Sequence, residues 1–138
     1  VCFLDGGAGS GILTFYLLKR AAKKVEAIEI DGPALENLRK NAGLNRIRGG
    51  LTVTHADATC FEPGFKADGL VANITSPVLV DSFPRFAHWL KPGQWAIFSG
   101  VNSTNAPAIR RALTKSGFQL VEEVSEGEWH AFFTRTGT

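Results

Sequence analysis

Short apolar runs alternate along the chain with stretches in which apolar residues recur every three or four positions. Runs rich in β-branched and aromatic residues are typical of strands, and we expect strands at residues 1–4, 25–29, 51–57, 67–73 and 95–99. Two further runs, 118–124 and 129–134, flank Glu126-Gly127 and predict a hairpin. This order predicts an α/β domain over residues 1–138, with a doubly wound, mostly parallel seven-stranded sheet that ends in an antiparallel hairpin.

The amphipathic stretches between these runs predict helices. In the first, one face carries Ile12, Leu13, Tyr16 and Leu17, and in the second a stripe carries Ala34, Leu35, Leu38 and Ala42. We expect Asp31 to cap the second helix, with Pro33 in its first turn.

Proline and glycine predict the later boundaries. Pro84 interrupts residues 78–90, so we expect a break or kink there rather than one long helix. Residues 91–93, Lys-Pro-Gly, predict a turn before the strand at 95–99. Thr104 or Asn105 can cap a last helix, which turns Ile109, Ala112 and Leu113 inward and ends at Gly117.

A glycine-rich loop follows the first strand, with the sequence Asp5-Gly6-Gly7-Ala8-Gly9-Ser10-Gly11. Glycine allows a backbone to approach a ligand closely, so the loop predicts a nucleotide-type cradle at the carboxyl end of a strand. A phosphate-binding P-loop needs Lys and then Ser or Thr after the last glycine, where this chain has Ile12 and Leu13. A dinucleotide fingerprint that starts at Gly7 needs glycine at position 12, which weakens a nicotinamide oxidoreductase hypothesis.

The loop has a carboxylate before it and no Lys or Arg ahead of Lys19. This arrangement suits a ligand with cationic groups and no phosphate, such as S-adenosylmethionine (SAM). The alternative is a tight strand–helix turn that binds no ligand.

Polar residues also stand at the ends of the next three strands. Glu29 stands eighteen residues after Gly11, where nucleotide folds place a carboxylate that accepts hydrogen bonds from two ribose hydroxyls. Asp31 competes for this role, but its position as a helix cap explains its presence without a ligand. Asp57 can accept from an adenine amino group while a neighbouring backbone N–H, that of Ala58, meets a ring nitrogen; the alternative is a solvated strand-end Asp. Asn73 faces the crevice where open α/β sheets bind ligands, or is a turn residue before a helix.

Composition narrows the remaining classes. The formal net charge of +2 is too balanced to argue for nucleic acid or membrane, and no apolar run is long enough to span a bilayer. The cluster Lys19, Arg20, Lys23 and Lys24 suits a helix C-terminus, with a nucleic-acid patch as the alternative. Cys2 and Cys60 lie among apolar residues and are expected to be buried free thiols of a reducing, cytoplasmic compartment.

Three other observations set expectations for the aromatic and imidazole side chains and for the chain ends. Trp89, Trp95 and Trp129 are expected to be packing residues. His55 is expected to be a half-exposed strand residue, and neither His88 nor His130 has the spacing of a metal ligand, so no metal is expected. The chain has no Met and starts inside a strand, which is typical of a piece of a longer protein.

In this order, the motifs resemble the SAM-dependent class I methyltransferases, which have a Rossmann-like fold, and among them the catalytic domain of the ribosomal protein L11 methyltransferase (PrmA) family. The matching stretches run nearly end to end: residues 4–13, 22–25, 28–31, 71–74, 90–93, 99–100, 117–118 and 126–129. The glycine loop alone indicates a methyltransferase, whereas Ala-Asn-Ile at 72–74 and Glu-Gly-Glu-Trp at 126–129 point to this family.

The resemblance implies a role for each site residue. The methionine part of SAM would be held by Asp5 and by the backbone of Gly6, Gly7, Ala8, Gly9 and Gly11. The ribose would be held by Glu29 with Ile30, and the adenine by Asp57 with Ala58. Asn73 and the Ile74 backbone would position the acceptor amine, a lysine or N-terminal amine of a protein such as a ribosomal protein. No nucleic-acid or membrane partner is expected.

Several departures from the family pattern bear on these roles. Glu29 stands where the family usually has Asp, which keeps the carboxylate and changes its reach. Thr75-Ser76-Pro77 is less apolar than the family segment after Asn-Ile, which bears on the choice of acceptor. The family's N-terminal recognition domain and the segment before the first strand are not in this sequence. A competing hypothesis is therefore a SAM-binding module that is inactive in isolation.

Overall fold

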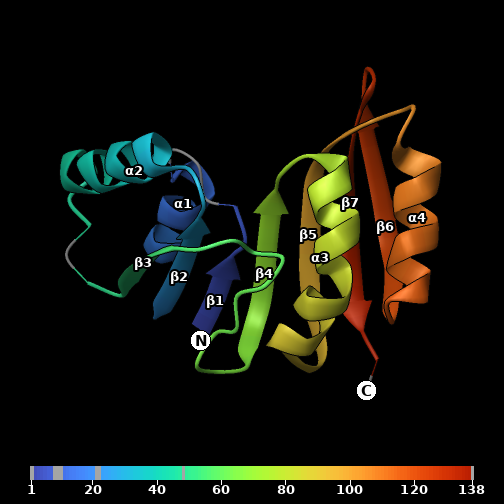
Figure 1. Cartoon of the computed structure of the whole chain (residues 1–138), viewed down its shortest axis with the longest axis horizontal. Helices are drawn as coiled ribbons and strands as arrows, with labels where there is room; N and C mark the ends of the chain where they lie inside the picture. Colours follow the sequence, from blue (N-terminus) through green and yellow to red (C-terminus); the bar gives the residue numbers. More distant parts are fainter. Residues whose placement is uncertain (1, 8–10, 21–22, 48, 138) are drawn as a thin grey trace.

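A computed structural model describes residues 2–7, 11–20, 23–47 and 49–137, and it contains one seven-stranded sheet of order β3-β2-β1-β4-β5-β7-β6 (Figure 1). The strands are β1 (Cys2–Asp5), β2 (Lys24–Glu29), β3 (Leu51–His55), β4 (Ala67–Asn73), β5 (Leu90–Asn102), β6 (Phe118–Glu126) and β7 (Trp129–Thr136). The first five pair in parallel, and β7 pairs antiparallel with both β5 and β6. The predicted doubly wound sheet with a terminal hairpin is therefore confirmed.

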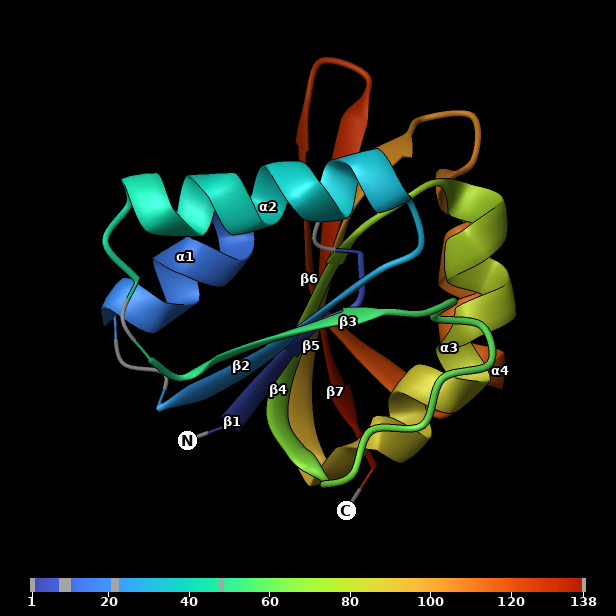
Figure 2. The same cartoon turned by 60° about the vertical axis from the view of Figure 1, so that its left-hand side comes forward.

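Four helices cover the described sheet, two on each face (Figure 2). Helices α1 (Ile12–Arg20) and α2 (Gly32–Leu44) cover one face, and α3 (Ser76–Trp89) and α4 (Ala106–Lys115) cover the other. Asp31 caps α2 as predicted, because its carboxylate accepts from the backbone N–H of Ala34 at 3.1 Å. Asn105 is the N-cap of α4, although its side chain makes no capping hydrogen bond.

The larger part of the core lies under α3 and α4, where aromatic side chains pack edge to face. Phe83 lies 4.9 Å from Phe98 between ring centroids, and Phe98 lies 5.4 Å from Phe118. All three side chains are buried. This packing fixes the carboxyl ends of β4 and β5, which carry part of the candidate site.

The expected break at Pro84 is wrong, since α3 runs without interruption from Ser76 to Trp89, whereas the alternative expectation of a kink there stays a prediction. Proline removes one backbone donor to the carbonyl four residues earlier. Pro84 lies on the exposed side of α3, where water can hydrate that carbonyl, while Phe83 and Phe86 beside it are fully buried. Burial of the opposite face therefore maintains the helix.

The expected turn at residues 91–93 is instead part of β5, which begins at Leu90. Leu90 pairs with Ala67 and Trp95 pairs with Gly69, so the register shifts between the two pairs. Gly93 has a φ of 77° within this bulge. The extra residues are thus accommodated in the sheet without ending the strand.

Three expectations about burial are also wrong. Tyr16 is 56% exposed, because α1 buries Thr14 and Phe15 and leaves the Tyr16 ring under the Arg20 guanidinium, 5.2 Å from its centroid. Trp129 is 58% exposed at the start of β7. Cys2 and Cys60 are both free thiols, but Cys60 is exposed in the loop after β3 and Cys2 is half-buried.

Candidate functional site

The strand order reverses between β1 and β4, which are neighbours although β2 and β3 come between them in the sequence. From β1 the chain proceeds outward through β2 and β3, and it returns to start β4 on the other side of β1. A crevice outside the carboxyl ends of the strands forms at such a reversal. Asp5 ends β1 and Asn73 ends β4, so the two flank this crevice.

The Asp5 side chain is fully buried behind the glycine loop. Thr14, in the first turn of α1, donates its hydroxyl to Asp5 Oδ2 at 2.8 Å, and the Gly7 N–H donates to Oδ1 at 3.4 Å. Burial raises the pKa of Asp5 to about 6, helped by the nearby charge of Glu29 and opposed by these hydrogen bonds. No Lys or Arg is among the described groups that set this pKa.

The described glycines of the loop leave no room for side chains. A Cβ on Gly7 would overlap Cγ2 of Ile74, and a Cβ on Gly6 would meet the Phe86 ring at 3.0 Å. Gly11 has a φ of 94°, and a Cβ there would lie 2.6 Å from the Phe15 ring. The loop thus packs directly on the segment after β4 and on α1. Ala8 and Gly9 lie outside the described residues.

Glu29 lies at the carboxyl end of β2, half-buried, and its carboxylate turns toward the start of α2. Its Oε2 accepts from the backbone N–H groups of Ile30 at 3.0 Å and Asp31 at 3.1 Å. The Ile30 side chain is 60% exposed. Both residues therefore lie at the same edge of the sheet as Asp5.

Asp57 follows β3, which ends two residues earlier than predicted, at His55. Its Oδ1 accepts from the hydroxyl of Thr59 at 2.7 Å and from the Thr59 N–H at 2.9 Å, and these bonds lower the Asp57 pKa. Ala58 is buried. The imidazole of His55 is exposed and lies 2.7 Å from the Ile30 carbonyl oxygen.

Asn73 is exposed at the end of β4, and Ile74 follows it toward α3. Asn73 pairs with Ser99 of β5. The next residue, Gly100, has a φ of 80°, and a Cβ there would overlap the amide oxygen of Asn73. Gly7 on one side and Gly100 on the other therefore define where Ile74 and Asn73 lie.

Two of these contacts were not predicted from the sequence. Thr14 stands nine residues after Asp5 in a helix assigned by its apolar pattern, and nothing in that pattern indicates its bond to a carboxylate. Gly100 was noted only as part of a matching stretch. Its positive φ and its contact with Asn73 depend on the pairing of β4 with β5.

A cavity of about 330 Å³ lies between the end of β5 and the β6–β7 hairpin. Its walls include Ser99 and Gly100 from β5 and His130 from β7. The tip of this hairpin stands at the same edge of the sheet as the carboxyl end of β4 (Figure 1). The cavity therefore lies at the same edge of the sheet as the crevice.

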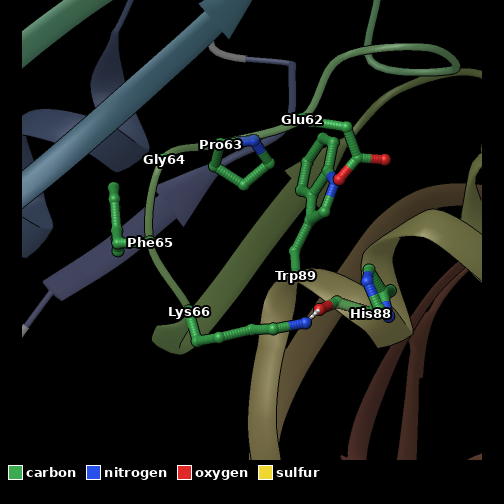
Figure 3. Close-up of a pocket in the computed structure, with 7 residues that line it drawn as sticks. All are labelled: Glu62, Pro63, Gly64, Phe65, Lys66, His88 and Trp89. Carbon is green, nitrogen blue, oxygen red and sulfur yellow. Dashed lines mark hydrogen bonds between the residues drawn. The ribbon is translucent and has the colours of Figure 1, made fainter.

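A second cavity, of about 280 Å³, lies at the opposite edge of the sheet, between the segment before β4 and the C-terminal end of α3 (Figure 3). The Lys66 ammonium reaches across it to the carbonyl oxygen of His88, and Trp89 forms one wall. Glu62 pairs with Arg85. Its charged groups are thus engaged with the protein itself, far along the sheet from Asp5 and Asn73.

The described residues contain no group of three or more His, Cys, Asp or Glu side chains that could hold a metal ion. Within the same residues, no helix is both long and apolar enough to cross a membrane.

Comparison with known proteins gives consistent matches to one family. Residues 2–136 match the family model described as ribosomal protein L11 methyltransferase (PrmA). A protein of that name from Gloeobacter violaceus is 37% identical over 92% of this chain and 40% of its own length. Its counterpart from Limosilactobacillus reuteri is 33% identical over 98% of this chain and 42% of its length.

A solved structure of ribosomal protein L11 methylase from Lactobacillus delbrueckii superposes with a TM-score of 0.93 at 29% identity. It covers 99% of this chain and 70% of that one. The N-methyltransferase NodS from Bradyrhizobium japonicum, solved with S-adenosyl-L-homocysteine, shares the fold with a TM-score of 0.80 at 15% identity, over 98% of this chain and 77% of that one. The chain spans about two fifths of the length of the curated relatives named above.

Proposed function

The chain belongs to the ribosomal protein L11 methyltransferase (PrmA) family, and from this premise we propose that it binds SAM and transfers a methyl group to an amine nitrogen of a protein. One observation supports the proposal above the others. Asn73 and Ile74 lie at the strand-order reversal, directly against the glycine loop at Gly7 and the backbone at Gly100. An amide oxygen that can orient an amine is thereby held next to a cradle suited to SAM.

The buried carboxylate of Asp5 fits a cationic ligand. It has no Lys or Arg among the described groups that set its pKa, and the loop in front of it carries little side-chain bulk. An unpaired buried charge is costly, and a ligand cation close to the loop would offset that cost. We assign Asp5, with the backbone of Gly6, Gly7, Ala8, Gly9 and Gly11, to the methionine end of SAM.

The remaining cofactor contacts follow the order of the strands. Glu29 would accept from the ribose hydroxyls beside Ile30, and Asp57 with the Ala58 N–H would hold the adenine. Thr59 already donates two hydrogen bonds to one Asp57 oxygen, which holds that side chain in place. These positions lie side by side along the carboxyl edge, as an extended nucleoside requires.

Methyl transfer requires mainly that the amine nitrogen, the methyl carbon and the sulfur be aligned and that water be excluded. SAM, when bound, supplies an electrophilic methyl group on a sulfonium. The amine must be neutral to attack, and a lysine side chain has a reference pKa of about 10.4. Asn73 would accept a hydrogen bond from the amine through its Oδ1, with the Ile74 backbone beside it, and would so direct the nitrogen lone pair.

The name of the relatives suggests a ribosomal protein as acceptor, and we propose this class of substrate for the present chain. Such an acceptor would place the activity in the cytoplasm. It requires neither a nucleic-acid nor a membrane partner. The family's recognition domain would contribute to the choice of protein in a longer chain.

The test has a binding stage and a transfer stage. We expect calorimetry to detect micromolar SAM binding and no NADH binding. Transfer of labelled methyl from SAM to a lysine-containing ribosomal protein would then be measured for the wild type and Asn73→Ala. We expect the variant to bind SAM with little change and to lose most turnover.

Two results would contradict this assignment. An equal loss of SAM affinity and turnover in Asn73→Ala would exclude the acceptor role. SAM binding without transfer, both in this chain and in one extended upstream, would favour a SAM-binding module without activity.

A further inference from the structure

A groove lies between the first turns of α3 and α4, which are neighbours on the same face of the sheet (Figure 2). It encloses about 310 Å³, at the lower end of the roughly 300–1,000 Å³ that is typical of ligand pockets. Its apolar lining consists of Pro77 and Val80 from α3 and of Ala108 and Ile109 from α4. We call this cavity the α3–α4 groove.

The α3–α4 groove begins at the carboxyl edge of the sheet, near Asn73. Ser76, which also lines it, comes three residues after Asn73, so the two Cα atoms are at most about 11 Å apart. Asp81, another lining residue, lies five residues further along α3, a rise of about 7.5 Å. An extended chain rises about 3.3 Å per residue, so about six residues of an acceptor would reach from Asn73 to Asp81.

Asp81 gives the α3–α4 groove a negative charge. Its side chain is exposed, and it forms no ion pair within the part of the chain that the structure describes. Arg85, one turn further along α3, pairs with Glu62 instead. The helix dipole stabilises carboxylates in the first turn, whereas Asp81 stands in the second turn of α3. Neither an ion pair nor the dipole therefore accounts for Asp81, which is accessible to a cation of a ligand.

The walls of the α3–α4 groove present apolar surface to water. Val80 is 37% exposed, and Pro77 and Ala108 are exposed too. Helix α3 packs on the sheet through other residues, such as Leu79 and Phe83, which are fully buried. A Lys or Arg side chain can lay its apolar stem along such a wall while its charged end reaches a carboxylate. The groove therefore suits a peptide segment that carries both an apolar side chain and a cation.

We propose that the α3–α4 groove binds the stretch of the acceptor protein beside the modified amine, with an apolar side chain between the two helices and a Lys or Arg at Asp81. The inference rests on the proposed amine methyltransferase function and extends it to the sequence around the modified residue. Opposite charges at a contact favour the matching partner over others. The groove would thus select which lysine reaches Asn73, and its residues take no part in the chemical step.

The test measures kcat and KM for methyl transfer to a lysine-containing ribosomal protein by wild type, Asp81→Lys and Ala108→Phe. Asp81→Lys reverses the charge, and we expect KM for the acceptor to rise about three- to tenfold at low salt with kcat unchanged. The rise should shrink at about 1 M salt, where charges are screened within about 3 Å. Ala108→Phe narrows the groove, so it should raise KM at both salt concentrations.

Glu36→Lys is the matched control. Glu36 is an exposed carboxylate in the second turn of α2, on the other face of the sheet, and its replacement changes the net charge equally. SAM affinity and Tm should stay close to wild type in all three variants. An equal rise of KM in Glu36→Lys and Asp81→Lys would indicate a general charge effect and overturn the inference. A lower SAM affinity or kcat at unchanged KM would overturn it as well.

A charge exchange then identifies the acceptor residue that meets Asp81. Each Lys or Arg of the acceptor within about six positions of the methylated lysine is replaced by Glu, one at a time. One replacement should raise KM with wild type, and Asp81→Lys should restore it. If Asp81→Lys restores none, the contact at Asp81 is wrong.

The two proposals fail in different ways. Unchanged KM in both Asp81→Lys and Ala108→Phe would overturn the groove as a binding site and leave the methyltransferase assignment intact. If wild type transfers no methyl, the proposed function is wrong, and the inference falls with it.

Discussion

The amide oxygen of Asn73 occupies the space that a side chain on Gly100 would need. These residues come from neighbouring parallel strands, since Asn73 ends β4 and Gly100 lies inside β5. Gly100 also has a φ of 80°, which residues with a side chain rarely adopt. The backbone of β5 therefore decides where the Asn73 side chain lies.

We expect Gly100→Ala to displace the Asn73 amide and to reduce methyl transfer at least tenfold, with SAM affinity nearly unchanged. Gly117→Ala is the matched control. Gly117 has a φ of 92°, but a Cβ there meets nothing within 4 Å. Both variants carry a similar backbone strain of about 1–2 kcal/mol, so their Tm values should fall alike. Equal turnover in the two variants would show that the contact with Asn73 is unimportant.

Gly7→Ala tests the contact between the glycine loop and Ile74. The added methyl would overlap Ile74 Cγ2, so we expect weaker SAM binding and lower stability. Ile74→Ala removes that methyl, and the double variant should recover part of the SAM affinity lost by Gly7→Ala. Residues in contact typically couple by about 0.5–3 kcal/mol in such a cycle, measured here by calorimetry and thermal unfolding. Gly32→Ala, where a Cβ meets nothing within 4 Å, is the control, and additive effects would contradict the contact.

Asp5 should make SAM binding depend on pH. Burial raises its pKa to about 6, so the carboxylate becomes neutral below that pH and no longer attracts a ligand cation. We expect SAM affinity to fall by up to tenfold per pH unit below about pH 6 and to be nearly constant from pH 7 to 8. Calorimetry across this pH range measures the SAM affinity. Asp5→Asn should bind SAM weakly, with an affinity that does not change with pH. A steep dependence that persists in Asp5→Asn would point to another group.

Asp5 should also make the free protein less stable at neutral pH. Its folded pKa lies above the ordinary value of 3.8, so the folded state binds more protons and the free energy of unfolding falls as pH rises from about 4 to 6. Asp5→Asn removes this cost, and we expect it to be more stable by up to about 3 kcal/mol at pH 7. Near pH 4 the two should converge. Thermal unfolding without ligand tests it, and an Asp5→Asn that is less stable at both pH values would contradict it.

The sequence predicted the sheet, its hairpin and the edge that carries Asp5, Glu29, Asp57 and Asn73. These features depend on local patterns, namely alternating apolar runs and polar residues at strand ends. Such patterns can be recognised in the sequence without knowing the tertiary contacts. The Asp31 cap was predictable for the same reason. Its hydrogen bond to Ala34 spans only three residues.

Features that depend on distant neighbours were not predictable. Pro84 is tolerated because the opposite face of α3 is buried by residues from other elements. Tyr16 fits the apolar stripe of α1, yet α1 buries Thr14 and Phe15 instead and leaves Tyr16 exposed. Hydrogen bonds also link Ser103, Arg110, Glu123 and His130, which come from a loop, α4, β6 and β7 and meet only through tertiary packing. No spacing along the chain indicates these bonds.

Arg110 lowers the pKa of Glu123 from 4.5 to about 2. A carboxyl with a depressed folded pKa contributes stability that is fully present above its unfolded pKa and is lost as pH falls toward the folded value. We therefore expect Glu123→Gln to have a lower Tm than wild type at pH 7, by a few degrees, as suits roughly 1 kcal/mol from an ion pair near the surface. The difference in Tm between Glu123→Gln and wild type should narrow from pH 4.5 downward and vanish near pH 2.

Glu122→Gln serves as the control for Glu123→Gln, because Glu122 is exposed at the preceding position of β6. Thermal unfolding between pH 2 and pH 7 compares the three proteins. A deficit in Glu123→Gln that stays constant down to pH 2 would mean that shape rather than charge makes Glu123 important. If the Tm difference from wild type narrows at low pH for Glu123→Gln and not for Glu122→Gln, the ionised carboxylate of Glu123 joins α4 to the hairpin. Arg110 is the first cause of the depressed Glu123 pKa.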